Sequence, residues 1–265
     1  MRTLTIDGKE FSVAENFNEL SKEQLLCFAA DFYLQLPRFF WLNDQNEQEP
    51  ISEDCYNALL YTQLLNILQI DLELFDKFSG EDVVFLLDEM KLIHFLLEES
   101  TLTINHFPQI NDLHGPENDF GDMDGEEFMW AEKFYIEFKQ TKDIQKLNAL
   151  IACLYRPADA ENKKLPFILK EVEENEKRVA GIDITIKTAI LFFFEGCRNE
   201  LPQLYPAVFE GKKQKDGDFN EVLLQVAKDG PFGDFYSVLR TNIHLIYKEL
   251  NRVRKEAIEM KRNMQ

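Results

Sequence analysis

The chain has 265 residues, of which 45% are hydrophobic, and 48 acidic against 29 basic side chains give it a formal net charge of −19. This composition excludes disordered and fibrous proteins and is typical of a soluble globular protein. The negative charge disfavours nucleic acid and membranes as partners, because binding to phosphate backbones and anionic lipids depends on Lys and Arg.

Residues 1–16 are predicted to form a small β-hairpin. Apolar and polar residues alternate over 4–6 and over 11–13, on either side of Asp7-Gly8. Glycine tolerates the positive φ angle that a tight hairpin turn requires. This start differs from signal and transit peptides, so we expect a cytoplasmic protein.

Residues 17–110 are predicted to form a first helical subdomain. Ser21 and Gln24 match a capping box at the start of a helix that ends near Pro37. Ser52 is predicted to cap a second helix, because serine accepts a hydrogen bond from the first turn.

The apolar spacing over 83–98 predicts a further buried helix, and residues 101–104 predict a short strand. Residues 111–124 are rich in Gly, Pro, Asn and Asp. We expect an acidic loop there that marks a subdomain boundary.

Residues 125–232 are predicted to form a second helical subdomain. Asp124 is the expected cap of its first helix, and Pro157 is expected to end the next one, because the residue before proline is disfavoured in the α region. Asp183 is predicted to cap a buried helix that contains three consecutive phenylalanines.

Residues 233–265 are predicted to form a long basic C-terminal helix, continuous from about Asp234 to Asn263. From Arg240 onward it contains seven basic and three acidic side chains. Its apolar residues repeat every seven positions in two sets, as in a coiled coil. The candidate partner-binding residues are Leu239, Ile243, Ile246, Leu250, Val253, Ala257 and Met260.

This heptad pattern allows two arrangements. The helix either pairs with another chain, which includes a homo-oligomer, or packs along the body of its own chain. In both arrangements, the protein works by contact.

A calcium site is disfavoured by the register of the acidic loop. Asp122, Asp124 and Gly125 would fill positions three, five and six of an EF-hand loop, but Phe120 and Ala131 would occupy positions one and twelve. The four cysteines are far apart, and no histidine lies at ligand spacing from them, so no metal site or disulfide is predicted.

Single residues with chemical potential have plain structural interpretations. His94 is predicted to lie in or at the edge of the core. Cys197, beside Arg198, is either a reactive thiolate or a packed thiol, and Arg156 is either a cation at a helix C-terminus or a partner contact. No common nucleotide-binding or hydrolase motif occurs. We therefore predict no catalytic residues, no cofactor and no enzyme.

Four segments resemble a group of proteins encoded in the tail-gene regions of phages and prophages of Bacteroidetes. They are Phe17-Asn18-Glu19-Leu20-Ser21-Lys22-Glu23-Gln24, then Glu127-Phe128 with Ala131-Glu132 and Tyr135, then Leu150-Ile151-Ala152-Cys153-Leu154-Tyr155-Arg156-Pro157, and Phe193-Phe194-Glu195-Gly196-Cys197-Arg198.

The resemblance implies a role in tail building and supplies no catalytic residues. One expectation is a soluble assembly chaperone in the bacterial host cell, which binds a tail component such as the tape-measure protein. The alternatives are a minor structural component of the tail or neck, which would be part of the virion, and an enzyme of unknown class.

Overall fold

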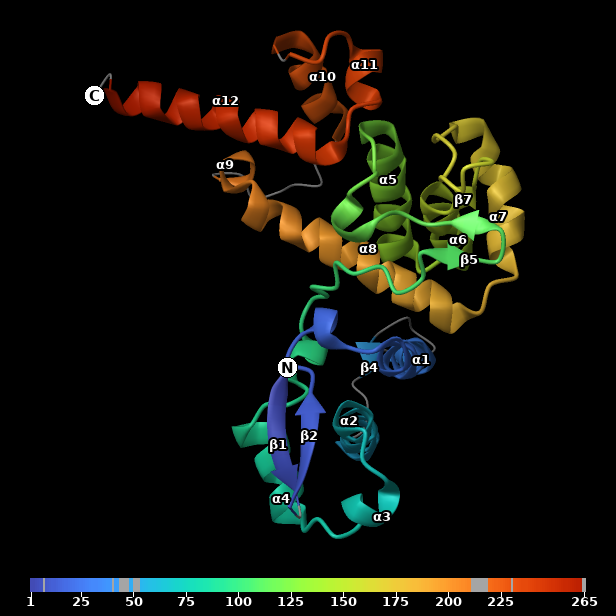
Figure 1. The fold of residues 1–265 in the computed structure, drawn as a ribbon, viewed down its shortest axis with the longest axis vertical. Helices are drawn as coiled ribbons and strands as arrows, with labels where there is room; N and C mark the ends of the chain where they lie inside the picture. Colours follow the sequence, from blue (N-terminus) through green and yellow to red (C-terminus); the bar gives the residue numbers. More distant parts are fainter. Residues whose placement is uncertain are drawn as a thin grey trace. The chain divides into compact units, whose positions relative to one another are not determined.

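The computed structural model describes residues 1–6, 8–39, 41–42, 48–49, 53–210, 219–229 and 231–263, with side chains outside 32–56, 220–222, 225 and 229. The described chain is mainly helical, with an N-terminal hairpin and a long C-terminal helix (Figure 1), which confirms the predicted fold class. The predicted turn residue Asp7 and the predicted cap Ser52 lie outside the described residues.

The chain divides into two compact units. Unit 1 consists of Met1–Leu102 and Asp183–Gly196, and unit 2 consists of Thr103–Ile182 and Cys197–Gln265. The acidic loop 111–124, which the sequence marks as a subdomain boundary, lies inside unit 2. Its composition resembles that of a linker, but Phe120 and Met123 are buried.

Unit 1 begins with the predicted hairpin. Strands β1 (Arg2–Ile6) and β2 (Lys9–Val13) pair antiparallel, and Gly8 adopts a φ of +78° at the turn. The other elements of unit 1 are η1 (Phe17–Glu19), α1 (Lys22–Phe39), β3 (Trp41–Leu42), β4 (Gln48–Glu49), α2 (Glu53–Leu68), α3 (Leu72–Phe75), α4 (Gly80–Val84), η2 (Phe85–Glu89), η3 (His94–Leu97) and the first part of α8 (Ile184–Leu204).

The predicted capping box at the start of α1 is confirmed. Ser21 Oγ accepts from the backbone N–H of Gln24 at 3.2 Å, and Gln24 Oε1 accepts from that of Ser21 at 2.9 Å. These bonds satisfy two donors that a helix N-terminus leaves unpaired. The core of unit 1 lies beside this cap, where Phe28 stacks on Phe192 at a centroid distance of 5.0 Å and Phe17 contacts both rings.

The prediction of one helix over 83–98 is wrong. Helix α4 passes into the π-helical turn η2, where the N–H of Met90 bonds to the carbonyl of Phe85. Lys91 then adopts a positive φ of +52°, which ends the helix before η3. Apolar spacing alone does not reveal such a change in backbone hydrogen bonding.

The predicted strand at 101–104 is also wrong, because residues 100–102 lie against α8 instead of pairing with a strand. Ser100 Oγ donates to the carbonyl of Phe192 at 2.7 Å. A Cβ atom on Gly196 would lie 2.2 Å from the carbonyl oxygen and 2.3 Å from the nitrogen of Leu102. Only glycine permits this close crossing of two backbones.

Unit 2 contains a three-stranded antiparallel sheet and several helices. Its elements are β5 (Gln109–Ile110), β6 (Leu113–His114), η4 (Asn118–Phe120), α5 (Gly125–Thr141), α6 (Ile144–Leu154), β7 (Arg156–Pro157), η5 (Leu169–Glu171), α7 (Val172–Ala180), the end of α8, α9 (Pro206–Phe209), α10 (Phe219–Asp229), α11 (Phe235–Leu239) and α12 (Ile243–Asn263).

Three predicted helix boundaries agree with the structure. Asp124 Oδ1 accepts from the N–H of Glu127 at 2.8 Å at the start of α5, and Asp183 Oδ1 accepts from the N–H of Thr185 at 2.8 Å at the start of α8. Helix α6 ends at Leu154, three residues before Pro157. Local hydrogen bonding and proline sterics determine these boundaries, so short sequence patterns predict them.

Gly196→Ala is expected to lower the free energy of unfolding by about 2 to 3 kcal/mol, because the added methyl group would overlap the backbone of Leu102. Gly181→Ala is the matched control, since nothing lies within 4 Å of a Cβ atom at that position. Thermal and urea unfolding of both variants measure the effect, and equal stability of the two would contradict the close crossing.

Candidate functional site

The predicted continuous C-terminal helix is interrupted. Helix α11 ends at Leu239 and α12 begins at Ile243. The N–H of Gly125 donates to the carbonyl of Thr241 at 3.0 Å, and the N–H of Ile243 donates to the carbonyl of Met123 at 3.0 Å. The backbone between the two helices therefore bonds to the segment before α5, and the expectation of one helix from 234 to 263 is wrong.

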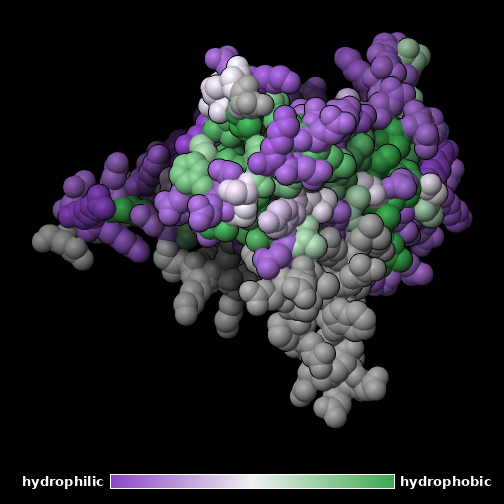
Figure 2. Space-filling view, turned by 90° about the horizontal axis from the view of Figure 1, so that it is seen from below, coloured by the Kyte–Doolittle hydropathy of each residue, from purple (hydrophilic) through white to green (hydrophobic). Residues whose placement is uncertain are grey.

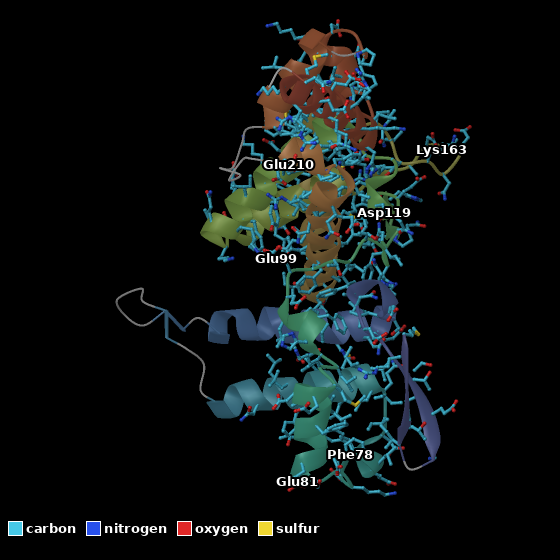
Figure 3. The ribbon with its side chains drawn as sticks, turned by 90° about the vertical axis from the view of Figure 1, so that its left-hand side faces the viewer. Phe78, Glu81, Glu99, Asp119, Lys163 and Glu210 are labelled. Atoms are coloured by element: carbon cyan, nitrogen blue, oxygen red, sulfur yellow. The ribbon has the colours of Figure 1, made fainter. Side chains whose placement is uncertain are left out.

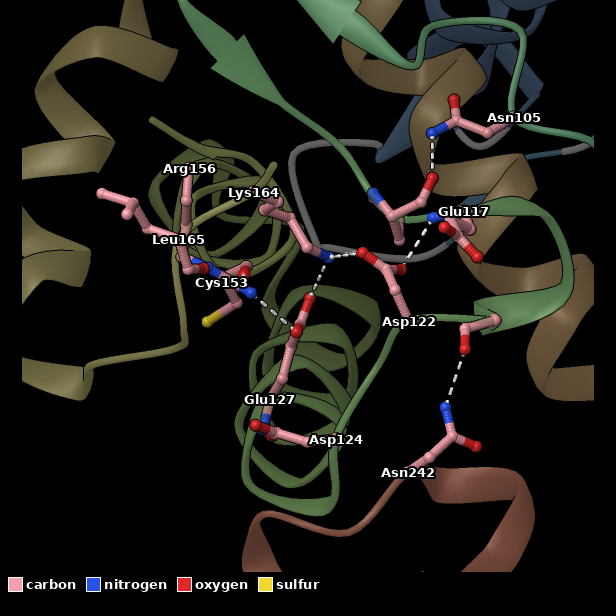
Figure 4. A network of polar contacts seen from close by, with 12 residues as sticks. Asn105, Glu117, Asp122, Asp124, Glu127, Cys153, Arg156, Lys164, Leu165 and Asn242 are labelled. Atoms are coloured by element: carbon pink, nitrogen blue, oxygen red, sulfur yellow. Dashed lines mark hydrogen bonds and ion pairs between the residues drawn. The ribbon is translucent and has the colours of Figure 1, made fainter. Parts of the chain in front are cut away.

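Side chains reinforce this junction between α5 and α12. Asn242 Nδ2 donates to the carbonyl of Gly121 at 2.8 Å (Figure 4). The Arg240 guanidinium lies 3.0 Å from the carboxylate of Glu126. A Cβ atom on Gly125 would lie 2.9 Å from Ile246 Cδ1, so glycine allows α12 to approach the first turn of α5 closely.

The structure places the seven predicted partner-binding residues in three different environments. The first four lie in the core of unit 2, the next is half-buried, and the last two are exposed, with Met260 at 60%. In that order they are Leu239, Ile243, Ile246 and Leu250, then Val253, then Ala257 and Met260. The predicted packing along the chain's own body therefore applies to the first half of the row alone.

Aromatic rings cover the first half of α12. The ring of Tyr247 lies 5.6 Å from that of Tyr205, 5.7 Å from that of Phe209 and 5.8 Å from that of Phe219. Burial raises the pKa of the Tyr247 hydroxyl. Because Tyr247 stands beside the heptad row, the apolar repeat did not identify it.

The short helix α9 lies along α12 as far as Arg254 (Figure 1). The N–H of Ala207 donates to Asn251 Oδ1 at 2.9 Å, and Arg254 Nη1 donates to the carbonyl of Val208 at 2.6 Å. Beyond this contact, residues 255–263 are exposed apart from Ile258.

We call residues 252–263 the distal half of α12. It contains five basic and two acidic side chains, a net charge of +3. Arg252 pairs with Glu249 at 2.6 Å and with Glu256 at 2.5 Å on its own helix. In Figure 2 the distal half is the arm on the left, where hydrophilic residues surround a small hydrophobic area.

A buried cluster of charges lies at the start of α5 (Figure 4). Glu127 is 1% exposed, and its carboxylate accepts from Arg156 Nη2 at 2.8 Å and from Lys164 Nζ at 3.1 Å. Lys164 also lies 3.0 Å from the carboxylate of Asp122. Lys163, which precedes Lys164 in the segment between β7 and η5, is exposed, and its side chain projects away from that segment (Figure 3). Sequence reasoning missed this cluster, because its members are far apart in the chain.

Arg156 acts at the C-terminus of α6, as one of its two interpretations expects. Its Nη1 donates to the carbonyl of Cys153 in the last turn of that helix, and its Nε donates to the carbonyl of Leu165 at 2.9 Å. The cation thus satisfies one carbonyl in the last turn of α6, the carbonyl of Leu165 and the buried Glu127 carboxylate together.

The acidic loop uses its carboxylates for local structure. Asp124 caps α5, and Asp122 Oδ1 accepts from the N–H of Glu117 at 2.7 Å. Among the described residues, no three His, Cys, Asp or Glu side chains are grouped so that they could hold a metal ion.

The thiols of Cys153 and Cys197 are buried, and burial raises the pKa of both. Arg198 lies 2.9 Å from the carboxylate of Glu132. This geometry favours the packed interpretation of Cys197 over the reactive thiolate. Cys27, by contrast, is exposed.

His94 differs from the expected core position. Its side chain is 58% exposed, and its Nδ1 lies 3.7 Å from the carboxylate of Glu98 one helical turn later. The apolar residues on either side of His94 suggested burial, but His94 lies at the start of the separate 3-10 helix η3, with its side chain exposed.

His244 joins three segments of unit 2 at the first turn of α12. Its Nε2 donates to the carbonyl of Asp119, and its Nδ1 forms a hydrogen bond with the Tyr205 hydroxyl at 2.9 Å. Burial raises the pKa of the Tyr205 hydroxyl. These contacts join the first turn of α12 to the end of α8 and to the acidic loop.

No protein-family model, no curated protein and no solved structure matches the chain. Within the described parts of the chain, no helix is both long enough and apolar enough to cross a membrane.

Glu127→Gln is expected to lower the free energy of unfolding of unit 2 by about 3 kcal/mol, because it removes the counter-charge of the buried Arg156 and leaves Lys164 with Asp122 alone. Glu126→Gln, one residue earlier, is the control and should cost less than about 1 kcal/mol, since its partner Arg240 is half exposed. Urea unfolding followed by Trp130 fluorescence, with Trp41 replaced by Phe, measures both. Equal losses would contradict the buried cluster.

Alkylation should distinguish the thiols. In the folded protein near pH 8, Cys153 and Cys197 are expected to react at least about tenfold more slowly than Cys27, because a thiolate is the reactive form and burial disfavours it. Mass spectrometry of the peptides that contain Cys27, Cys153 and Cys197 gives the rates. Labelling of Cys197 as fast as that of Cys27 would instead indicate a reactive thiolate at Cys197.

Proposed function

We propose that the chain is a noncatalytic tail-assembly protein of a phage or prophage, which acts in the host cytoplasm as a soluble chaperone for a tail component such as the tape-measure protein. The observation that carries the proposal is the distal half of α12, whose apolar residues Ala257 and Met260 are exposed on a helix held firmly at its other end. The resemblance described above supplies the assignment to tails.

The chemistry of the described side chains is consistent with a binding protein. Arg156 and Arg198 pair with carboxylates, and Cys153 and Cys197 are packed thiols of raised pKa. The buried charges of unit 2 thus serve the folded structure, while its exposed apolar row is available for contact.

Affinity purification tests the proposal. The tagged chain, expressed in a host before and after prophage induction, is expected to recover a tail protein in the induced sample alone, and mass spectrometry identifies that protein. Recovery of no tail protein after induction would contradict a role in tail assembly.

The structural alternative gives a different result in purified particles. A chaperone leaves its partner before the particle is complete, so the chain should be absent from purified virions. A fixed stoichiometric amount in virions would instead identify a minor component of the tail or neck.

A further inference from the structure

We infer that the distal half of α12 binds an acidic amphipathic helix of another protein. This inference rests on the proposed function, since it names the chemistry of the partner that the chain would hold.

The apolar contact surface continues a row that is already used inside unit 2. Ile246 and Leu250 lie in the core, and the same row continues through Val253 to Ala257 and Met260, where its cover ends. The uncovered part has the residue spacing with which two helices pack side by side. Residues 252–263 would span about 18 Å of helix, enough for three turns of a partner.

The charges along this row favour an acidic partner. Arg254 and Lys261 follow Val253 and Met260 by one position each, so both lie along the same edge of the row. Glu256 lies along the other edge, where its carboxylate is already paired with Arg252. A partner helix with Glu or Asp along this edge would supply a counter-charge to Lys261 and to Arg254, whose Nη1 already donates to the carbonyl of Val208.

A second copy of α12 fits this surface poorly in either direction. Antiparallel pairing of two identical helices brings equal edges together, so Arg254 and Lys261 would face the same basic residues of the copy. Parallel pairing would require the copy to follow the row toward Leu250 and Ile246, which the core of unit 2 covers. The remaining occupant is a helix of opposite charge on a different chain.

Two synthetic peptides test this inference on the full chain. Each has about 21 residues and the same leucine heptad row, and one has Glu along both edges while the other has Lys. We expect the Glu peptide to bind at least about tenfold more tightly by fluorescence anisotropy, and its affinity to fall as salt is raised. Equal binding of the two peptides, or no binding of either, would overturn the inference.

Substitutions locate the binding surface. Ala257→Glu with Met260→Glu should remove binding of the Glu peptide, and Lys261→Glu should weaken it and strengthen binding of the Lys peptide. Leu224→Glu is the matched control, because Leu224 is exposed to 55% on α10 and lies outside the row. These positions are exposed, so circular dichroism should show every variant folded. Unchanged binding in the Ala257→Glu, Met260→Glu variant would overturn the inference.

Light scattering of the wild-type chain tests whether a second copy of the chain binds this surface. We expect a monomer, and a dimer that Met260→Glu converts to a monomer would assign the surface to self-association instead.

Failure of this inference is distinguishable from failure of the proposed function. If the Ala257→Glu, Met260→Glu variant still recovers the tail protein, the proposed surface is wrong and the proposed function stands. If the Glu peptide binds but no tail protein is recovered, the proposed surface stands and the proposed function is wrong.

Discussion

The buried carboxylate of Glu127 is the constraint on which unit 2 depends. An ionised carboxylate without solvent is tolerated only with partners, and here Arg156 and Lys164 supply them from the end of α6 and the loop that follows. This pairing holds the first turn of α5 in place. The same turn bonds to the start of α12 through the backbone N–H groups of Gly125 and Ile243, so the C-terminal helix is anchored beside the buried charge cluster.

Sequence reasoning succeeded where the interaction is local. The capping residues Ser21, Asp124 and Asp183 bond within three residues of themselves, and short patterns contain that information. It failed where distant segments decide the outcome. The interruption before Ile243 depends on carbonyl and amide groups near Met123, which a heptad count does not include. The same limit hid the cluster around Glu127, whose partners lie 29 and 37 residues away.

Most of the net negative charge of the chain lies in unit 1. The sequence of unit 1 carries 22 acidic and 7 basic side chains, a net charge of −15, and that of unit 2 carries −4. The distal half of α12 is basic within an acidic protein. Charge that would keep a complex in solution and charge that selects a partner are thus carried by different parts of the chain.

Helix α12 is packed along its first half and uncovered along its second. Hydrogen exchange of the isolated protein, read residue by residue along this helix, tests this arrangement most directly. The amides of 247–251 are expected to exchange at least about 100-fold more slowly than those of 257–262, because packing protects the first group against local opening. Uniform strong protection along the whole helix would instead show that the distal half is already covered.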